Sequence, residues 1–123
     1  MTTADDEFAQ EFARLSAAFV AELPQLVETL NDDLATWLSV SQESVSFDRL
    51  SNRLHQLRGS GSTFGCSGIS EEARILEQSL AALRADALAA DINEVKAAMR
   101  RLRGEANRIY RESLQGGQAG TQT

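Results

Sequence analysis

Residues 54–65, which read LHQLRGSGSTFG, combine a helical pattern with an unusual histidine. Apolar residues, with one glycine among them, recur there every three or four positions, which is the spacing of one helix face. They are Leu54, Leu57, Gly61 and Phe64. His55, the only histidine of the chain, lies just off this face, and Gly59 lies one turn further on. Because glycine costs a helix about 1 kcal/mol relative to alanine, we infer that bulk is kept away from His55 so that another molecule can approach it.

The rest of the chain is typical of a single all-α domain. It has 123 residues, enough for one hydrophobic core, with 42% apolar residues and one proline. Helix-forming residues dominate and strand signals are nearly absent. We expect an N-terminal tail over residues 1–4, a helical bundle over 5–114, and a flexible tail or linker over 115–123, where Gly, Gln and Thr have nothing to bury.

The first fifty residues predict two helical segments. Pro24 lies inside one long apolar pattern, and a proline there removes a backbone hydrogen bond. We therefore expect a kink or a break near it. The residues expected to face the core are Phe8, Phe12, Leu15, Phe19, Leu23, Leu26, Leu30, Leu34, Trp37 and Leu38.

Three further helices follow. A serine-rich loop is expected over 39–46, with Ser46 as N-cap and Val45 packing on Leu50. The glycines of residues 65–68 should end that helix, and Ser67 or Ser70 should cap the next. Residues 85–90 are ambiguous, and Asp91 with Glu94 should start the last helix. The expected core residues are Phe47, Leu50, Ile69, Ala73, Leu76, Leu80, Leu83, Ile92, Val95, Met99, Leu102, Ala106, Ile109 and Leu114.

Amphipathic helices joined by short turns predict an up-down antiparallel four-helix bundle, with an additional N-terminal helical segment ahead of Pro24.

Charge and composition exclude several functions. The net charge of −6 argues against nucleic acid as a partner. Residues 1–50 hold ten acidic and two basic side chains, whereas residues 51–123 hold ten basic and eight acidic ones. This asymmetry fits oppositely charged helices packed side by side, or a basic docking side.

An acidic N-terminus and the absence of a long apolar run predict a cytoplasmic protein without a membrane segment.

The chain has few residues that could bind a metal ion or a cofactor. Cys66 is the only cysteine and His55 the only histidine, so we expect no metal site and no cofactor. Cys66 itself is expected to be a small hydrophobe in a turn.

Catalysis by a serine, or by a nucleotide-binding loop, is also disfavoured. Ser51, Ser60 and Ser62 lie on the same predicted helix as His55 and cannot converge into a triad. The glycines follow no strand, and no Walker lysine is present. A single imidazole acting as nucleophile remains, provided that a partner holds the proton on its other nitrogen.

Glu77 is the candidate partner. His55 follows the core residue Leu54 by one position, and Glu77 follows Leu76 by one, so each is rotated about 100° from its buried face. In an antiparallel hairpin with its turn at residues 65–68, both side chains lie at the shared seam within about one turn of each other, or both point away from it. The alternative is that Glu77 is a solvated surface residue. Arg58 would set a positive charge near an incoming phosphoryl group, or is a plain surface arginine.

At these residues the chain resembles the histidine-containing phosphotransfer (HPt) domain family. The usual core of that family is H-x-L-K-G-[SA], with a further glycine six residues after the first. The chain has His55-Gln56-Leu57-Arg58-Gly59-Ser60, followed by Gly65. The similarity runs from Phe19 and Pro24 to Leu76-Glu77, and the run at residues 62–65 resembles the phosphotransfer domain of chemotaxis-type histidine kinases.

The resemblance implies that His55 carries a phosphoryl group, that Glu77 orients its ring and that Arg58 contributes charge where the family most often has lysine. Ser51, Gly59 and Ser62 would form the surface on which a response-regulator receiver domain docks, and the receiver would supply the acceptor aspartate and Mg²⁺. A histidine kinase catalytic domain would be the other partner.

On this reading the chain would be a monomeric phosphocarrier and kinase substrate without a nucleotide site. Two questions stay open. It would be a stand-alone module or a domain excised from a chemotaxis-type kinase. A different reading is a phosphorylation-independent adaptor that binds its partner through the same face.

Overall fold

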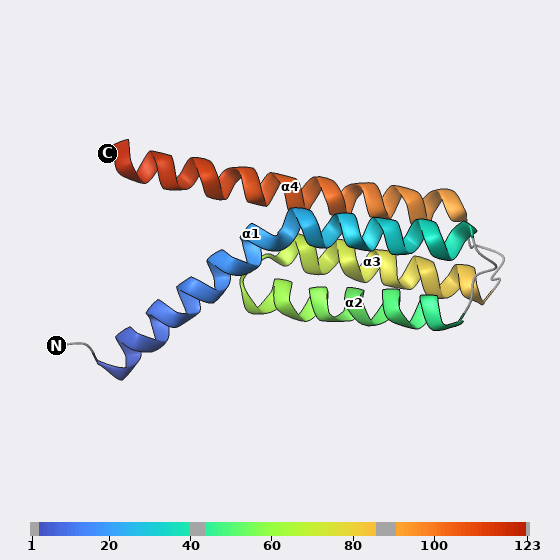
Figure 1. Cartoon of the computed structure of the whole chain (residues 1–123), viewed down its shortest axis with the longest axis horizontal. Coiled ribbons are helices and arrows are strands. Elements are labelled where there is room, and N and C mark those ends of the chain that lie inside the picture. The colour runs from blue at the N-terminus through green and yellow to red at the C-terminus, as the bar shows by residue number, and fades with distance from the viewer. Residues whose placement is uncertain (1–2, 40–43, 86–90, 123) are drawn as a thin grey trace.

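The computed structural model describes residues 3–39, 44–85 and 91–122, and these form four helices. They are α1 (Ala4–Ser39), α2 (Ser44–Thr63), α3 (Ser67–Arg84) and α4 (Ile92–Gln122). Each helix packs against the next in the chain, and α4 closes the ring against α1. Figure 1 shows the helices running alternately in opposite directions. The predicted all-α, up-down antiparallel four-helix bundle is confirmed, and the described residues contain no strand.

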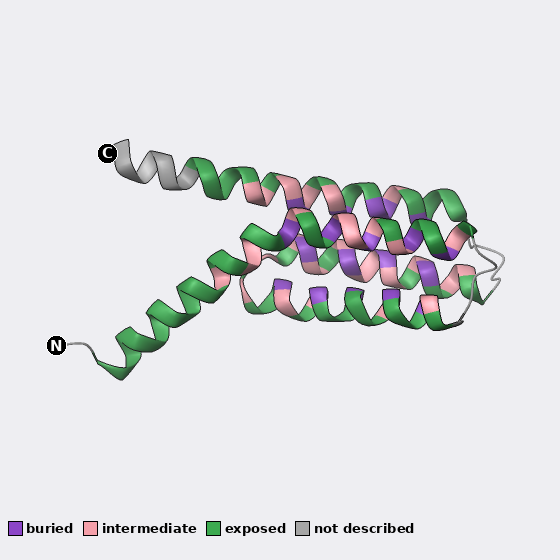
Figure 2. Ribbon diagram, in the orientation of Figure 1, coloured by how far each residue is buried: buried purple, intermediate pink, exposed green. Residues whose placement is uncertain are grey.

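The core lies between the four helices, as the purple bands of Figure 2 show. The predicted stripes of α2 and α3 are buried along almost their whole length, since each of these helices has a neighbour on both sides. The fully buried side chains include Leu50 and Leu54 of α2, Ile69, Leu76 and Leu80 of α3, and Val95 and Leu102 of α4. Ala98 is buried as well, although it was not among the predicted core residues.

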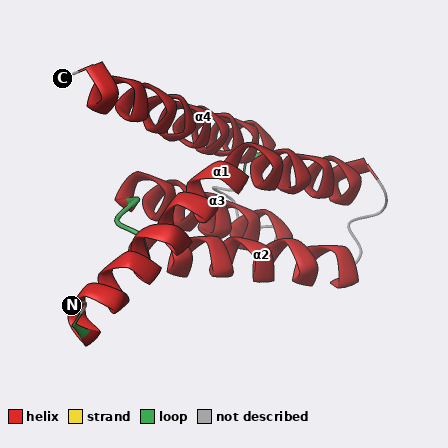
Figure 3. Ribbon diagram, turned by 60° about the vertical axis from the view of Figure 1, so that its left-hand side comes forward, coloured by secondary structure: helices red, strands yellow, loops and turns green. Residues whose placement is uncertain are grey.

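Helix α1 decides between the two outcomes expected at Pro24, a kink or a break. The helix is continuous through Pro24, so the expected break is wrong. Figures 1 and 3 show that the N-terminal part of the helix bends away from the bundle, in line with the expected kink. Pro24 is the residue that can cause such a bend, because it lacks the amide donor and its ring crowds the preceding turn.

The N-terminal half of α1 is not part of the core. Phe8, Phe12 and Leu15 are 72%, 38% and 43% exposed, against the prediction that they are buried. Figure 2 shows that this exposed part of α1 runs beyond the ends of α2 and α3. In the bundle half, Val27 is buried and Leu26 is 37% exposed, the reverse of the prediction for Leu26.

The helix ends also differ from the predicted ones. Helix α2 begins at Ser44, so Ser46 lies inside it and is not its N-cap, and Val45 is 69% exposed instead of packing on Leu50. The N-cap of α3 is Cys66, without a side-chain capping bond, so Ser67 and Ser70 are not caps. Asp91 does cap α4, because its carboxylate accepts a 2.8 Å hydrogen bond from the amide of Asn93.

At the ends of α4, Ile92 and Leu114 are 39% and 53% exposed instead of buried. Figure 1 shows that the C-terminal part of α4 runs on beyond the ends of α2 and α3. The backbone stays helical to Gln122, whereas a flexible tail was expected from residue 115. The domain limits of 5–114 remain a prediction. Residues 40–43 of the expected loop and residues 86–90 of the ambiguous segment lie outside the described residues. None of the described helices is both long and apolar enough to cross a membrane.

Candidate functional site on the α2–α3 hairpin

The turn between α2 and α3 sets the geometry of the site. Gly65 has φ of +74°, a left-handed conformation that glycine adopts at little cost, as predicted for this turn. The amide of Cys66 donates a 2.7 Å hydrogen bond to the carbonyl oxygen of Gly61, which closes the end of α2. With only three residues between the helices, α2 and α3 are forced into an antiparallel hairpin.

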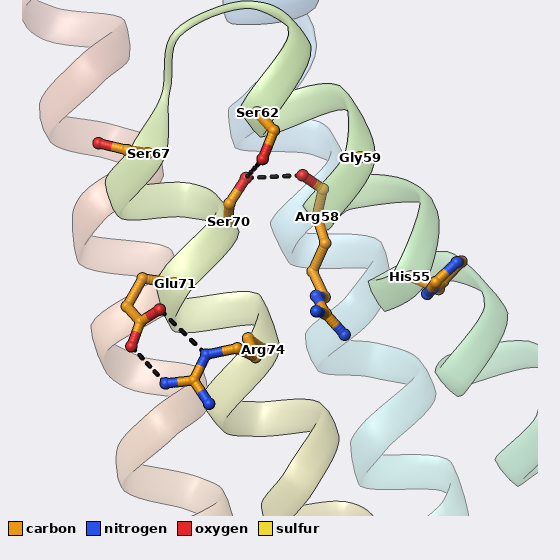
Figure 4. A pocket seen from close by; sticks show the side chains of 8 residues that line it. All are labelled: His55, Arg58, Gly59, Ser62, Ser67, Ser70, Glu71 and Arg74. Atoms are coloured by element: carbon orange, nitrogen blue, oxygen red, sulfur yellow. Dashed lines mark hydrogen bonds and ion pairs between the residues drawn. The ribbon is translucent and has the colours of Figure 1, made fainter.

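Gly61 and Ser70 fix how closely the two helices approach. A Cβ atom on Gly61 would lie 2.6 Å from Ser70 Oγ and 3.1 Å from the carbonyl oxygen of Cys66. The Ser70 hydroxyl donates a 2.6 Å hydrogen bond to the carbonyl oxygen of Arg58, and its Oγ lies 3.1 Å from Ser62 Oγ (Figure 4). Ser70 therefore links the two helices instead of capping α3, a role that the sequence analysis missed. Its signal is a small polar residue opposite a glycine of the buried stripe.

His55 lies on the outer side of α2, with 76% of its side chain exposed. Its Nδ1 atom is 4.0 Å from Oε2 of Glu77 on α3. This separation is longer than a hydrogen bond but within reach of a small side-chain rotation. The structure thus brings His55 and Glu77 to the shared seam, which is one of the two arrangements that the register argument left open. Because Nδ1 is the nitrogen that faces Glu77, Nε2 is left for an incoming group.

Glu77 makes its direct contact with Arg58. Arg58 donates a 3.0 Å hydrogen bond from a terminal guanidinium nitrogen to Glu77 Oε1. Only 23% of the Glu77 side chain is exposed, so it is not the solvated surface residue of the alternative reading. The Glu77 carboxylate therefore sits between the guanidinium of Arg58 and the ring of His55.

A groove of about 410 Å³ runs between α2 and α3 beside His55. Figure 4 shows the Arg58 side chain extending along the space between α2 and α3. The residues that line it are His55, Arg58, Gly59, Ser62, Ser67, Ser70, Glu71 and Arg74. Gly59 and Ser62 are thus placed beside His55 as predicted, whereas Ser51 lies one turn before His55 and outside this lining. The sequence analysis did not identify Arg74, although it stands one helical turn from Glu77.

The charges in the groove are paired. Arg74 donates a 3.0 Å hydrogen bond from Nε to Glu71, and this bond lowers the pKa of the Glu71 carboxyl and raises that of Arg74. At the turn, burial raises the pKa of the Cys66 thiol, in keeping with the predicted role of Cys66 as a small hydrophobe. Among the described residues, no three His, Cys, Asp or Glu side chains are grouped so that they could hold a metal ion.

The arrangement offers an accessible imidazole, a carboxylate that can hold its Nδ1 proton, and a guanidinium next to both. Such a set can accept a phosphoryl group on Nε2. Gly59 leaves space beside it, because a Cβ atom there would have nothing within 4 Å.

Comparison with known proteins agrees with this chemistry. A family model described as Hpt domain matches residues 14–105, which include the whole of the α2–α3 hairpin. Searches of curated proteins and of solved structures gave no match.

Proposed function

The chain belongs to the Hpt domain family, whose members transfer phosphoryl groups through a histidine in two-component phosphorelays; from this premise, we propose that His55 is the phosphoryl carrier. The observation that carries the proposal is the seam geometry. An imidazole with 76% of its side chain exposed has its Nδ1 atom 4.0 Å from a partly buried carboxylate.

In the proposed step, the Nε2 lone pair of neutral His55 attacks the phosphorus of an aspartyl phosphate on a receiver domain. The N–P bond forms as the bond from phosphorus to the aspartyl oxygen breaks, and the carboxylate leaves with that electron pair. The proton on Nδ1 stays on the ring, which becomes positively charged as it is phosphorylated. The reverse step returns the phosphoryl group to the aspartate.

Glu77 would act on this step through the ring. A carboxylate near Nδ1 favours the tautomer with the proton on that nitrogen, and it stabilises the positive charge that develops when Nε2 is phosphorylated. Arg58 would balance the charge of Glu77 before transfer and that of the phosphoryl group afterwards. An arginine can reach two partners because its guanidinium carries five donors.

The partners proposed are those of the family: a response-regulator receiver domain, which brings the aspartate and Mg²⁺, and a histidine kinase catalytic domain. Docking would use the open surface at Gly59 with Ser62 and, one turn away, Ser51. A chemotaxis-type kinase as the source of the phosphoryl group and a cytoplasmic location are further parts of the proposal.

The alternative function, a phosphorylation-independent adaptor, differs from the carrier in one respect. It would use the same face to bind a partner but would need no phosphate on His55. The test is transfer from a phosphorylated receiver to the wild type and to His55→Gln, which keeps a polar side chain on an exposed helix position. We expect acid-labile phosphate on the wild type and none on the variant. Equal labelling of both, or none of the wild type with every receiver and kinase tried, would overturn the carrier proposal. Receiver binding that persists without any labelling would favour the adaptor.

A further inference from the structure

The first eighteen residues of α1, residues 4–21, project from the bundle and are called the arm here (Figures 1 and 3). The arm carries a ridge of large apolar side chains, Phe8, Phe12 and Leu15, which are 72%, 38% and 43% exposed. The ridge has a defined place, because the rings of Phe12 and Phe64 stand 5.5 Å apart and Phe8 stacks on Phe12 at 6.3 Å. A contiguous exposed apolar surface of this kind marks an interaction site.

A groove of about 650 Å³ lies beside the ridge, between the arm and the C-terminal half of α4. Its α1 wall is made mostly of small side chains, among them Ala13, Ser16 and Ala17. Its α4 wall holds Tyr110 and Leu114, and Leu114 is 53% exposed. The small side chains of the arm leave room for the groove, and both of its walls carry apolar side chains.

The ridge and the small side chains belong to the same helix, about 100° apart around its axis. Two arms laid antiparallel can therefore each set the ridge into the other's small-residue groove. This is the self-complementary arrangement that a two-fold symmetric interface requires. It would complete a second four-helix packing from two arms and two α4 helices, outside the bundle of either molecule.

Charge favours the same pairing. The arm begins with Asp5, Asp6 and Glu7. On α4, Arg111 follows Tyr110 of the groove wall by one residue, whereas Arg108 is already paired with Glu105 and Glu112. In the antiparallel arrangement, the acidic start of one arm enters the groove at the Tyr110 end of the other molecule, next to Arg111. Opposite charges that meet in this way set the direction of docking.

We propose that the groove between the arm and α4 binds the arm of a second copy of this chain, so that the domain forms a symmetric dimer. This replaces the monomer predicted from the sequence. The dimer leaves the groove beside His55 free, because none of the residues that line it belongs to the arm or to α4. The proposal is therefore independent of the phosphocarrier function.

The test is sedimentation equilibrium of the full chain over a wide concentration range. The wild type should rise from the mass of one chain toward that of two. Phe8→Ser removes the most exposed ring of the ridge, and Ala17→Glu fills the groove with a charged side chain. Each should weaken the dimer about tenfold or more. Both positions are exposed, so circular dichroism should show the helical content of the wild type.

Val45→Ser is the matched control, because Val45 is 69% exposed but lies on α2 at the opposite end of the bundle. It should leave the dimer unchanged. A wild type that stays monomeric to the highest concentration overturns the proposal, and the groove would then suit a different partner. A dimer that Phe8→Ser and Ala17→Glu leave intact also overturns it, since its interface must lie elsewhere. Phosphotransfer to His55 by the Phe8→Ser variant should equal that of the wild type in either case.

Discussion

Two seams of the bundle carry nearly the same ion pair. On the α2–α3 seam Arg58 bonds Glu77 at 3.0 Å, and on the α3–α4 seam Arg101 bonds Glu72 at 3.0 Å. The two glutamate side chains are equally exposed, at 23%. What distinguishes the first seam is the third side chain, since only Glu77 has His55 within 4.0 Å. The comparison teaches that an ion pair at a helix seam is not itself a site. Its chemistry depends on what stands beside it.

The largest difference between the seams should appear in transfer rate. Glu77→Ala removes the carboxylate next to Nδ1, so we expect phosphorylation of His55 to slow by about 10- to 100-fold, the loss typical when the partner of a metal-ligating imidazole is removed. Glu72→Ala, with the same exposure and the same type of ion pair, should leave the rate unchanged. Transfer from a phosphorylated receiver, followed by rapid quenching, measures both. Equal rates for the two variants would remove Glu77 from the mechanism.

A methyl group added at a glycine of each seam should change the free energy of unfolding by different amounts. Gly61→Ala sets a methyl group 2.6 Å from Ser70 Oγ and within 3.2 Å of backbone atoms that cannot move aside. We expect a loss of about 1 to 3 kcal/mol in the free energy of unfolding, typical of overpacking.

Gly68→Ala is the control on the other seam, where the new methyl group would meet only the flexible side chain of Glu105. It should change stability by less than about 0.5 kcal/mol, as surface substitutions do. Urea unfolding followed by circular dichroism gives both values. If Gly61→Ala were as stable as the wild type, the α2–α3 approach would be looser than the structure has it.

The smallest effect concerns docking. Gly59 and Gly104 both lie on exposed faces with nothing within 4 Å of a new Cβ atom, but only Gly59 stands one turn from His55. Leucine at either position should raise stability by up to about 1 kcal/mol, because it favours the helix over glycine.

We expect Gly59→Leu to weaken receiver binding severalfold and Gly104→Leu, on α4, to leave it unaffected. Titration of each variant with a labelled receiver measures this. Receiver affinity that falls equally in both variants would place docking on a different face.

Much of the bundle could be predicted from the sequence, and α1 shows the limit. Periodicity identifies which face of a helix is apolar, and it did so for most of α1, with Leu26 predicted in place of the buried Val27. Whether that face is covered depends on where the neighbouring helices end, which the α1 sequence does not contain. Leu30 is therefore buried as predicted, whereas Phe8 on the same pattern is 72% exposed.

The site was predictable in register but not in side-chain contacts. The glycine turn and the stripes of α2 and α3 were enough to place Glu77 level with His55, but whether both side chains face the shared seam was left open and is decided by the structure. That Arg58 would bond Glu77, and Ser70 the backbone of α2, depends on side-chain rotamers and on the close approach at Gly61. The N-caps predicted for α2 and α3 were wrong for a related reason, because several serines near the start of each of these two helices could serve equally well by sequence.

The short α2–α3 turn also bears on how the protein folds. Arg58 and Glu77 are only 19 positions apart in the chain, and Ser70 is 12 positions from Arg58. Contacts between such near neighbours require closing only a small loop, so they cost little chain entropy and form early. We therefore expect the proposed phosphorylation site to assemble within a single hairpin, before α1 and α4 are in place. During synthesis, this hairpin would be shaped before α4 has left the ribosome.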